Sequence, residues 1–324
     1  MVMIIASILL LFSLLSMVYV YRFRGRRRYD SVRQYLRKGW PIFTPLNCLL
    51  YLFTRPRGRG AIMDLKAYPE LRPIRENWKT IRNEALALHC QRVFEQTARP
   101  DSAAYYDVGF RTFHKYGWSK FYLHWYGASH VSARRLCPET TRLLNRIPGV
   151  QGAMFSVLPA GAMLTPHADP VACSLRYHLG LATSDSSDCY IDIDGHRHEW
   201  REGQDLLFDE TFIHHARNDS REDRLILMCD VRRPTWLFGP LVNGFYCLLM
   251  KTTVVPNLDG DPRGAANRIF AGLAPLLARV RRLKQSAPAR YRLLKYSVNS
   301  LLVALALGLP AAAIVFAIRL LESA

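Results

Sequence analysis

The hydrophobic and polar positions divide the chain into apolar ends and a patterned middle. Residues 1–21 and residues 296–318 contain no charged side chain. Each run is as long as the roughly 20 apolar residues that cross a bilayer as a helix. We therefore expect a transmembrane helix at the N-terminus and another near the C-terminus.

The charges beside these runs separate a membrane anchor from its alternatives, a cleaved signal peptide for the first run and a buried core helix for the second. A signal peptide carries its positive charge before the apolar stretch, whereas here arginines follow it. A basic segment also precedes the second run. Basic flanks lie on the cytoplasmic side of a membrane, so we expect residues 22–295 to face the cytoplasm. The basic flanks are Arg22, Arg24, Arg26, Arg27 and Arg28, and then Arg279, Arg281, Arg282, Lys284, Arg290, Arg292 and Lys295.

The chain between the two apolar runs begins with segments of mixed character. Residues 22–70 are basic and include the apolar stretch Trp40–Phe53, which its prolines make too short and too broken to span a membrane. We interpret this stretch as interfacial and the residues after it as a linker. Apolar residues then recur at helical spacing in Leu71–Ala98, and a second helix is expected at Glu139–Ile147.

From Ala153 the period of the pattern becomes that of strands. Short β-favouring runs, separated by Gly, Pro, Asp and Ser, predict a sandwich or jelly-roll-like pair of sheets rather than alternating βαβ units. The runs are AMFSVL, CSLRYHLGL, DCYIDI, DLLFD and RLILMCDV. We therefore expect a mainly β catalytic domain with flanking helices at residues 71–235, its β core at about residues 150–235. Residues 236–295 form an apolar and basic membrane-proximal segment, whose stretch Trp236–Met250 is either a membrane-dipping helix or a core element.

The composition limits the classes of molecule that this protein is expected to bind. The net charge of +18 is concentrated beside the apolar runs. Nucleic acid is the usual alternative for such basicity, but no nucleic-acid-binding motif is visible, so attraction to anionic lipid headgroups is favoured. The seven cysteines are scattered without a CxxC pair, which indicates reduced thiols in the cytosol rather than a disulfide framework or a zinc site. We expect no nucleic acid and no obligate protein partner.

The sharpest chemical signal is the sequence PHADP at residues 166–170. In an extended chain, side chains two residues apart point to the same side, so His167 and Asp169 present an imidazole and a carboxylate together. One further histidine completes a two-histidine, one-carboxylate face that leaves positions on iron(II) open for a cosubstrate and oxygen. His214 and His215 compete for that place, because neighbouring strand residues point oppositely. The alternative is a polar turn that ends at the proline.

Four polar residues inside otherwise apolar strands are candidates for binding a cosubstrate. Arg224 begins the strand RLILMCDV, where it either projects into solvent or clamps a dicarboxylate in bidentate fashion. Ser156 lies in AMFSVL, and Arg176 and His178 share one face of SLRYHLGL. A charged group on a core-facing strand is costly unless it is paired or binds a ligand.

The string PHADPVACSLRYHLGL…GQDLLFDETFIHHARN…DRLILMCDVRRP resembles the aspartyl/asparaginyl β-hydroxylase family. It looks more closely like the bacterial lipid A 2-hydroxylases, which share two terminal membrane segments and a stretch similar to GWSKFYLHWYG at residues 117–127. The likeness covers nearly the whole chain. It implies a double-stranded β-helix, a cupin-like jelly roll, that binds iron(II), 2-oxoglutarate and O2.

The resemblance also implies roles for individual residues. His167 and His214 match the metal-binding histidines, which favours His214 over His215. Asp169 fills the carboxylate position, although animal peptide hydroxylases of the family have glycine there. The residues that match those around 2-oxoglutarate are Ser156, Arg176, His178 and Arg224. Of these, the resemblance places Arg224 on the distal carboxylate, and Arg176 and His178 near the metal-bound end. No side-chain general base or nucleophile is needed.

Membrane placement suggests the substrate. A soluble peptide gives no reason for two membrane spans and apolar interfacial segments, whereas an acyl chain of a membrane lipid does. We therefore expect a dioxygenase of the bacterial inner membrane, with its catalytic domain in the cytoplasm, that hydroxylates C2 of a secondary acyl chain of lipid A or of a related lipid. It would decarboxylate 2-oxoglutarate to succinate. The alternatives are a peptide aspartyl/asparaginyl β-hydroxylase and a non-catalytic membrane scaffold that retains the fold.

Overall fold

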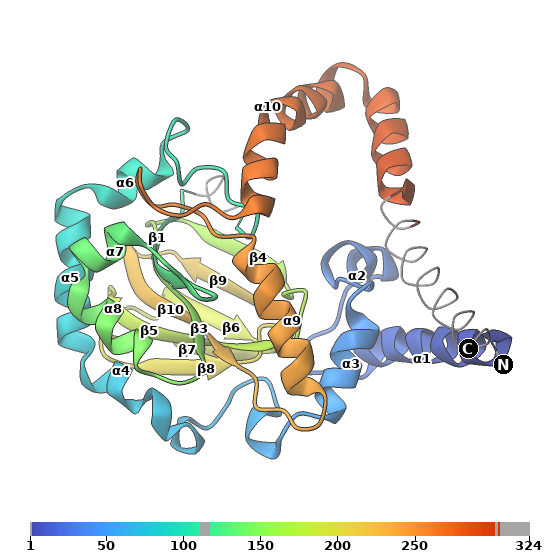
Figure 1. The fold of residues 1–324 in the computed structure, drawn as a ribbon, viewed down its shortest axis with the longest axis horizontal. Helices are drawn as coiled ribbons and strands as arrows, with labels where there is room; N and C mark the ends of the chain where they lie inside the picture. Colours follow the sequence, from blue (N-terminus) through green and yellow to red (C-terminus); the bar gives the residue numbers. More distant parts are fainter. Residues whose placement is uncertain (1, 111–116, 302–303, 305–324) are drawn as a thin grey trace, which may run out of the picture. The chain divides into compact units, whose positions relative to one another are not determined.

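The strands of the computed structural model, which describes residues 2–110, 117–301 and 304, form two antiparallel sheets (Figure 1). The strands are β1 Ser119–Trp125, β2 Ala128–Ser129, β3 Val150–Leu158, β4 Met163–His167, β5 Ser174–Ala182, β6 Cys189–Ile193, β7 His196–Glu199, β8 Asp205–Phe208, β9 His214–Asn218 and β10 Arg224–Arg232. One sheet has the order β2-β1-β3-β10-β5-β8, and the other has the order β4-β9-β6-β7. The expected antiparallel pair of sheets is confirmed.

The β core begins earlier than the sequence pattern predicted. β1 and β2 precede residue 150, and β1 pairs with β3 from Ser119 to Trp125. All residues of β1 after Ser119 are buried. A strand that is buried on both faces shows no alternation of apolar and polar residues. The predicted start of the β core at about residue 150 is therefore corrected to Ser119.

The residues of β10 supply both hydrophobic cores. Ile226 and Met228 point into the space between the two sheets, where Trp200 is fully buried. Leu225 and Leu227 point to the opposite face and pack under the helices. Each buried side chain of this size contributes roughly 1.5–3 kcal/mol to the stability of the fold. The alternation along β10 is therefore strongly favoured, and it determines which polar residues of this strand face the space between the sheets.

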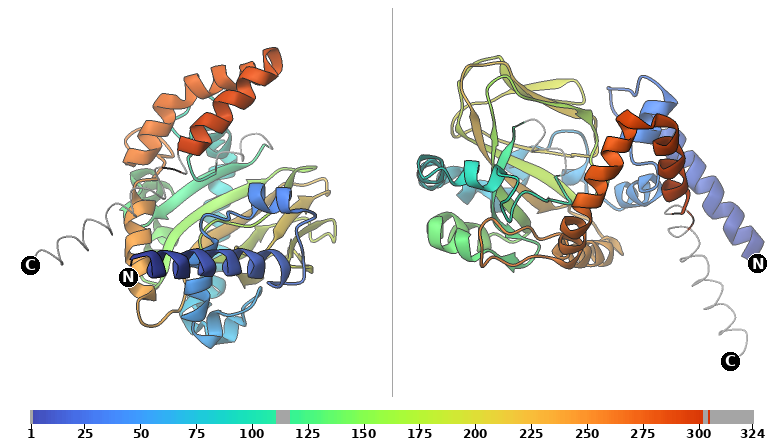
Figure 2. Two further views of the ribbon diagram at one scale, coloured as in Figure 1. Left: turned by 90° about the vertical axis from the view of Figure 1, so that its right-hand side faces the viewer. Right: turned by 90° about the horizontal axis from the view of Figure 1, so that it is seen from above.

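Helices cover the outer face of the six-stranded sheet (Figures 1 and 2). Ile81, Ala85 and Leu88 belong to the same core as the outer face of β5. The helix expected at Leu71–Ala98 is three helices, because the chain turns at Asn77 and adopts a left-handed φ of 56° at Arg92. These three are α4 Arg72–Glu76, α5 Trp78–Cys90 and α6 Val93–Ala98, and the helices α7 Val131–Leu136 and α8 Pro138–Asn145 pack on the same core.

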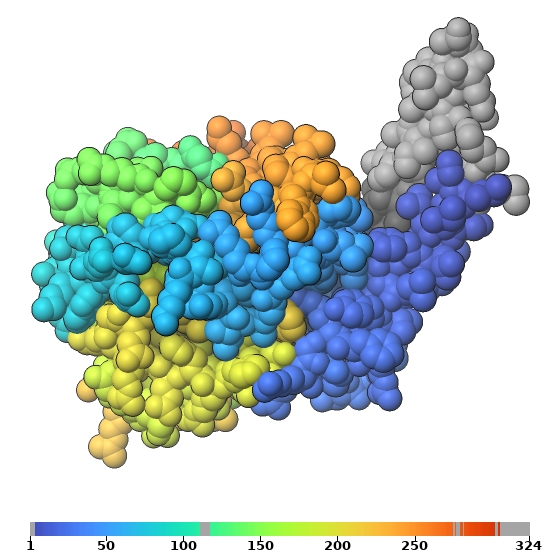
Figure 3. All heavy atoms as spheres, turned by 90° about the horizontal axis from the view of Figure 1, so that it is seen from below, coloured from blue at the N-terminus to red at the C-terminus, as the bar shows by residue number. Residues whose placement is uncertain are grey.

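The N-terminal helices precede this domain, and the chain then runs across its surface (Figure 3). They are α1 Val2–Arg22, α2 Val32–Lys38 and α3 Thr44–Leu52, followed by short 3-10 helices η1 Pro56–Gly58, η2 Leu65–Ala67 and η3 Pro69–Leu71. Within the described residues, the stretch Ile4–Arg22 is long and apolar enough to cross a membrane, and 6% of its apolar window is buried. The expected stretch Trp40–Phe53 forms α3 and the turn before it.

The stretch Trp236–Met250 is an amphipathic helix, α9 Gly239–Lys251. Its inner side packs Tyr246 and Cys247 against the core between the sheets. Its outer side exposes 78% of Leu241 and 63% of Leu248. The helix therefore has one side in the core between the sheets and one exposed apolar side.

The chain divides into two compact units, residues 1–268 and residues 269–324. The described part of the second unit is helical and contains most of α10 Ala265–Ser286. Most of the second expected membrane span, residues 296–318, lies outside the described residues.

Candidate active site

The fold brings His167, Asp169 and His214 together. His167 ends β4 and His214 begins β9, and the two are partners across this strand pair. Their ring centroids lie 4.3 Å apart, and His167 Nε2 lies 3.6 Å from Asp169 Oδ1. One donor atom from each of the three residues fits within 4.8 Å of the others. This triangle has the size and the donor set of a two-histidine, one-carboxylate metal site.

Backbone carbonyls set the orientation of both histidines. His167 Nδ1 lies 2.9 Å from the carbonyl oxygen of Thr165, and His214 Nδ1 lies 3.0 Å from that of Phe212. A carbonyl oxygen only accepts, so each Nδ1 carries the proton and each Nε2 keeps a free lone pair, as metal-binding histidines require. Burial, reinforced by His167, lowers the pKa of His214 to about 4. Its imidazole is therefore neutral at pH 7.

His215 points away from this triangle. Its Nδ1 lies 3.9 Å from Asp192 Oδ1 on the neighbouring strand β6. The alternation of side chains along β9 thus directs His214 inward and His215 to the other face of the sheet.

Asp169 is held in place by the backbone and by Arg176. Its backbone N–H donates to the carbonyl of Glu210 at 2.8 Å, and its Oδ2 accepts from Arg176 Nη2 at 3.3 Å. Burial opposes ionisation of Asp169, but His167, His214 and Arg176 outweigh it and hold the pKa of this carboxyl below its usual range. The carboxylate is therefore charged, with one oxygen toward Arg176 and the other toward His167.

Arg176 lies among three acidic groups, two of which the sequence pattern did not reveal. Its Nε lies 2.7 Å from Glu210 Oε2 and 3.2 Å from Asp230 Oδ1, and its Nη2 also contacts Glu210 and Asp169. Burial raises the pKa of Glu210 well above its usual value. The sequence did offer a signal for both acids. Glu210 in FDETF and Asp230 in MCDV lie next to or within apolar strands, where a buried acid needs a partner.

Arg224 carries a buried charge for which the described residues offer no counter-ion. Its side chain is 2% exposed, and its Nε and Nη1 have no hydrogen-bond partner in the described part of the chain. Burial lowers the pKa of Arg224 to about 10. The guanidinium lies 4.9 Å from the centre of the Trp200 ring. A buried, unpaired cation is costly, and a bound carboxylate would remove that cost.

Ser156 and His178 share the inward face with Arg224. Ser156 is opposite Ile226 and His178 is opposite Met228 in the ladders that flank β10. The Ser156 hydroxyl and both ring nitrogens of His178 are buried and have no hydrogen-bond partner among the described residues. Such orphaned polar atoms indicate a site built for a polar ligand.

Ring contacts connect this polar cluster to the metal triangle. The His178 ring lies 5.1 Å from that of Phe208, which lies 5.6 Å from that of His214. The predicted cosubstrate residues and the predicted metal ligands therefore occupy one inter-sheet space.

The segment after the first apolar helix, residues 22–53, binds the loop that carries His167 and Asp169. Side chains from α2, α3 and the turn between them donate to alternate carbonyls of residues 166–170. Lys38 Nζ lies 3.0 Å from the oxygen of Pro166, Trp40 Nε1 lies 3.0 Å from that of Ala168, and Asn47 Nδ2 lies 2.9 Å from that of Pro170. The path of the loop with His167 and Asp169, the HxD loop, thus depends on residues that follow the first apolar helix in the sequence.

Arg24 binds the second metal-site segment, which leads to His214. Its guanidinium donates to the carbonyl of Thr211 at 2.8 Å and to Asp209 at 3.0 Å, and it stacks on the ring of Phe212 at 3.7 Å. The Tyr51 hydroxyl also donates to Thr211 Oγ1 at 2.8 Å. The expectation that the first basic flank faces lipid headgroups is therefore wrong for Arg24, because its charge is buried against Asp209.

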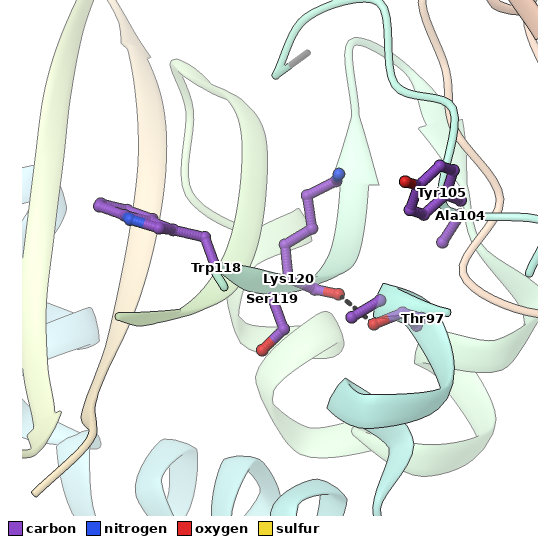
Figure 4. A pocket seen from close by; sticks show the side chains of 7 residues that line it. Thr97, Ala104, Tyr105, Trp118, Ser119 and Lys120 are labelled. Atoms are coloured by element: carbon purple, nitrogen blue, oxygen red, sulfur yellow. Dashed lines mark hydrogen bonds between the residues drawn. The ribbon is translucent and has the colours of Figure 1, made fainter. Parts of the chain in front are cut away.

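A small hollow beside Lys120 has no room for a ligand. Its volume of about 10 Å³ leaves room for no more than one water molecule. Figure 4 shows Thr97 beside it, whose hydroxyl donates to the carbonyl of Lys120 at 3.0 Å. Lys120 itself pairs with Asp107 at 2.8 Å.

The sequence is similar to known hydroxylases. The family model described as aspartyl/asparaginyl beta-hydroxylase matches residues 75–234. The ornithine lipid ester-linked acyl 2-hydroxylase of Rhizobium tropici is 34% identical over 118 residues, which are 36% of this chain and 42% of that protein. The human aspartyl/asparaginyl beta-hydroxylase is 31% identical over 173 residues, which are 52% of this chain and 22% of that protein.

The solved structures that this chain is similar to have low sequence identity to it. A Pseudomonas putida prolyl-4-hydroxylase is 18% identical, with a TM-score of 0.31, over 48% of this chain and 88% of that one. The chain spans less than half the length of the curated relatives named above.

Proposed function

Residues 75–234 are a domain of the aspartyl/asparaginyl β-hydroxylase family, and from this premise we propose that the protein is an iron(II)- and 2-oxoglutarate-dependent hydroxylase of membrane lipids. Its reaction is hydroxylation of C2 of an ester-linked acyl chain, with a secondary acyl chain of lipid A as the first candidate. The observation that carries the proposal is the triangle of His167, Asp169 and His214 together with Arg224, which has no counter-ion among the described residues.

The residues present fit the metal. The Nε2 atoms of His167 and His214 and the ionised carboxylate of Asp169 would hold iron(II). Arg176 orients Asp169, and the carbonyls of Thr165 and Phe212 orient the two rings. When bound together, iron(II) and 2-oxoglutarate supply the oxidation of an unactivated C–H bond by O2, and 2-oxoglutarate leaves as succinate and CO2.

The residues present also fit the cosubstrate. We assign the distal carboxylate of 2-oxoglutarate to Arg224, whose unsatisfied N–H groups would donate to it. The hydroxyl of Ser156 would donate to the same ligand, and His178 would contact it closer to the metal. The apolar walls, which include Trp200, Phe208 and Ile226, exclude water from this space.

Membrane attachment supports a lipid substrate. The exposed apolar helix α1 and the exposed outer side of α9 both need an apolar environment. We propose that residues 1–21 and 296–318 are membrane spans, with the catalytic residues 71–235 on the cytoplasmic side of a bacterial inner membrane. Residues 22–70 and 236–295 then lie at the membrane surface. The acyl 2-hydroxylase of Rhizobium tropici, by its name, acts on a lipid.

Anaerobic titration of the purified full chain with iron(II) and 2-oxoglutarate tests the site. We expect a metal-to-ligand absorption band that needs both additions, and succinate release when O2 and lipid are then added. A chain that binds neither iron(II) nor 2-oxoglutarate would be a scaffold, and the proposal would be wrong.

Peptide β-hydroxylation is the second candidate, since the human relative carries that activity in its name. The two functions differ in their product. A lipid hydroxylase adds oxygen to a lipid and leaves proteins unchanged, whereas a peptide hydroxylase does the opposite. Mass spectrometry of both fractions from one culture separates them.

A further inference from the structure

A cavity of about 640 Å³ lies between α1, α3 and the segment that leads to His214. Its volume is in the range of small-molecule binding sites. Four of its lining residues, Phe12, Leu15, Tyr19 and Phe23, follow one face of α1 and the turn after it. Leu52 of α3 and Phe212 complete the apolar wall.

The apolar wall of this cavity is poorly covered by protein. Phe23 is 66% exposed, Leu52 is 63% exposed and Leu15 is 59% exposed. An exposed apolar hollow of this kind is unfavourable in water. Because α1 is itself the proposed membrane helix, the medium at the mouth of the cavity is lipid.

The polar end of the cavity is positively charged. Arg24 and Arg233 both pair with Asp209, at 3.0 and 2.8 Å. Arg59 donates its Nε to the carbonyl of Thr54 at 2.9 Å, and no acidic side chain of the described residues lies within ion-pair distance of it. The lining therefore holds three guanidinium groups and one carboxylate, which leaves an unbalanced charge for an anion.

We propose that this cavity binds one acyl chain of a membrane lipid with an anionic phosphate headgroup, and that Arg59 contacts the phosphate. This inference deepens the proposed function, because it rests on the lipid hydroxylase reading and names the class of lipid. The apolar wall binds the acyl chain of the lipid, and the positively charged end binds its phosphate headgroup.

The cavity is close to the candidate metal centre. Asp209 and Phe212 line it, and the carbonyl of Phe212 accepts the Nδ1–H of His214. One short backbone segment, residues 209–214, therefore connects the wall of the cavity to the metal ligand His214. A lipid seated here packs on the segment that holds His214.

Photo-crosslinking tests the proposal without iron or 2-oxoglutarate. The full chain is placed in phosphatidylcholine nanodiscs that contain a trace of phosphatidylglycerol with a diazirine on one acyl chain, and the labelled peptides are identified by mass spectrometry. We expect labels on Leu52 and on residues 209–212, outside the helix that any bilayer would label. The same diazirine on phosphatidylcholine should label these residues about tenfold less, since its choline cation competes with Arg59 for the phosphate and leaves the headgroup with no net negative charge.

Matched variants separate the cavity from the bilayer. Leu15→Trp fills the cavity and should abolish labelling of residues 209–212, whereas Leu14→Trp, at a neighbouring position that does not line the cavity, should not. Arg59→Gln should erase the preference for phosphatidylglycerol, and the exposed Arg37→Gln should preserve it.

Two results would overturn the inference: labels confined to α1, or equal effects of Leu15→Trp and Leu14→Trp. Folding of each variant is checked by its melting temperature. A chain that labels as expected but never oxidises a lipid would keep this binding site and reject the proposed function, so the two failures are distinguishable.

Discussion

The guanidinium of Arg176 lies 3.3 Å from Asp169 Oδ2, while the other oxygen of Asp169 lies 3.6 Å from His167 Nε2. One side of the carboxylate is therefore bound by the protein and the other is presented to the metal triangle. Asp230, which is the partner of Arg176 across the β5–β10 ladder, and Glu210 hold the guanidinium in turn. Asp169 is thus held by a buried arginine that two further acids keep in place.

Arg176→Lys tests this support. Lysine keeps the charge but cannot bridge several carboxylates, so we expect about tenfold to a hundredfold weaker binding of iron(II). Anaerobic titration of the metal measures the affinity. The exposed Arg201→Lys is the control, and wild-type iron affinity in a folded Arg176→Lys protein would contradict the assigned role.

His214→Ala and His215→Ala distinguish the two adjacent histidines. His214 faces His167 and Asp169, whereas His215 faces Asp192. We expect the first variant to lose the absorption band of the iron(II)–2-oxoglutarate complex and the second to retain it. The reverse pattern would mean that β9 is assigned in the wrong register.

Arg224→Gln should weaken 2-oxoglutarate binding without weakening iron binding. The variant loses the charged partner of a buried carboxylate, which corresponds to an increase of about thirtyfold or more in the Kd of 2-oxoglutarate. Ser156→Ala should have a smaller effect because it removes a neutral hydrogen bond. Arg232→Gln, on the exposed end of the same strand, is the control. Equal 2-oxoglutarate affinity in Arg224→Gln and Arg232→Gln would remove Arg224 from the site.

The stability of the domain should fall in mild acid because of buried histidines outside the site. Burial lowers the pKa of His124 on β1 to about 4, below the value of about 6.5 in an unfolded chain. The native state therefore binds fewer protons than the unfolded state between these pH values. The stability is complete above pH about 6.5 and is lost as the pH falls to about 4, by up to roughly 3 kcal/mol for this one group.

His124→Gln should flatten that dependence, as measured by the melting temperature of the detergent-solubilised protein across this pH range. Other buried histidines, such as His130, leave part of the slope. His89→Gln replaces an exposed histidine and should leave the slope unchanged. If His124→Gln kept the full slope, His124 would not be the group that titrates.

The pairing of His167 with Asp169 was predictable because its signal is local, whereas the choice of His214 over His215 came from the family resemblance. The two-residue spacing of His167 and Asp169 needs only an extended strand, and His214 lies at the start of another short strand. The sheet pair was also predictable from the spacing of its apolar runs. What was missed depends on contacts between distant segments. β1 is buried on both faces, so its pattern lacks a period, and Glu210 and Asp230 reach Arg176 only after the sheets have paired.

The role of residues 22–53, the segment after the first apolar helix, could not be read from its composition. Its basic and apolar residues predicted a membrane surface, whereas Arg24 is buried on Asp209 and Trp40 donates to the HxD loop. An arginine that snorkels to lipid and one that anchors a loop look alike in a sequence. Only the position of the loop decides between them.

Expression of the full chain in a Gram-negative host whose lipid A is not hydroxylated tests the central claim most directly. Mass spectrometry of the purified lipid A should show a gain of one oxygen atom on a secondary acyl chain, located at C2 by fragmentation, and the His214→Ala protein should not produce it. Unchanged lipid A and unchanged phospholipids from cells that contain folded, iron-loaded protein would contradict the claim that this site oxidises a membrane lipid.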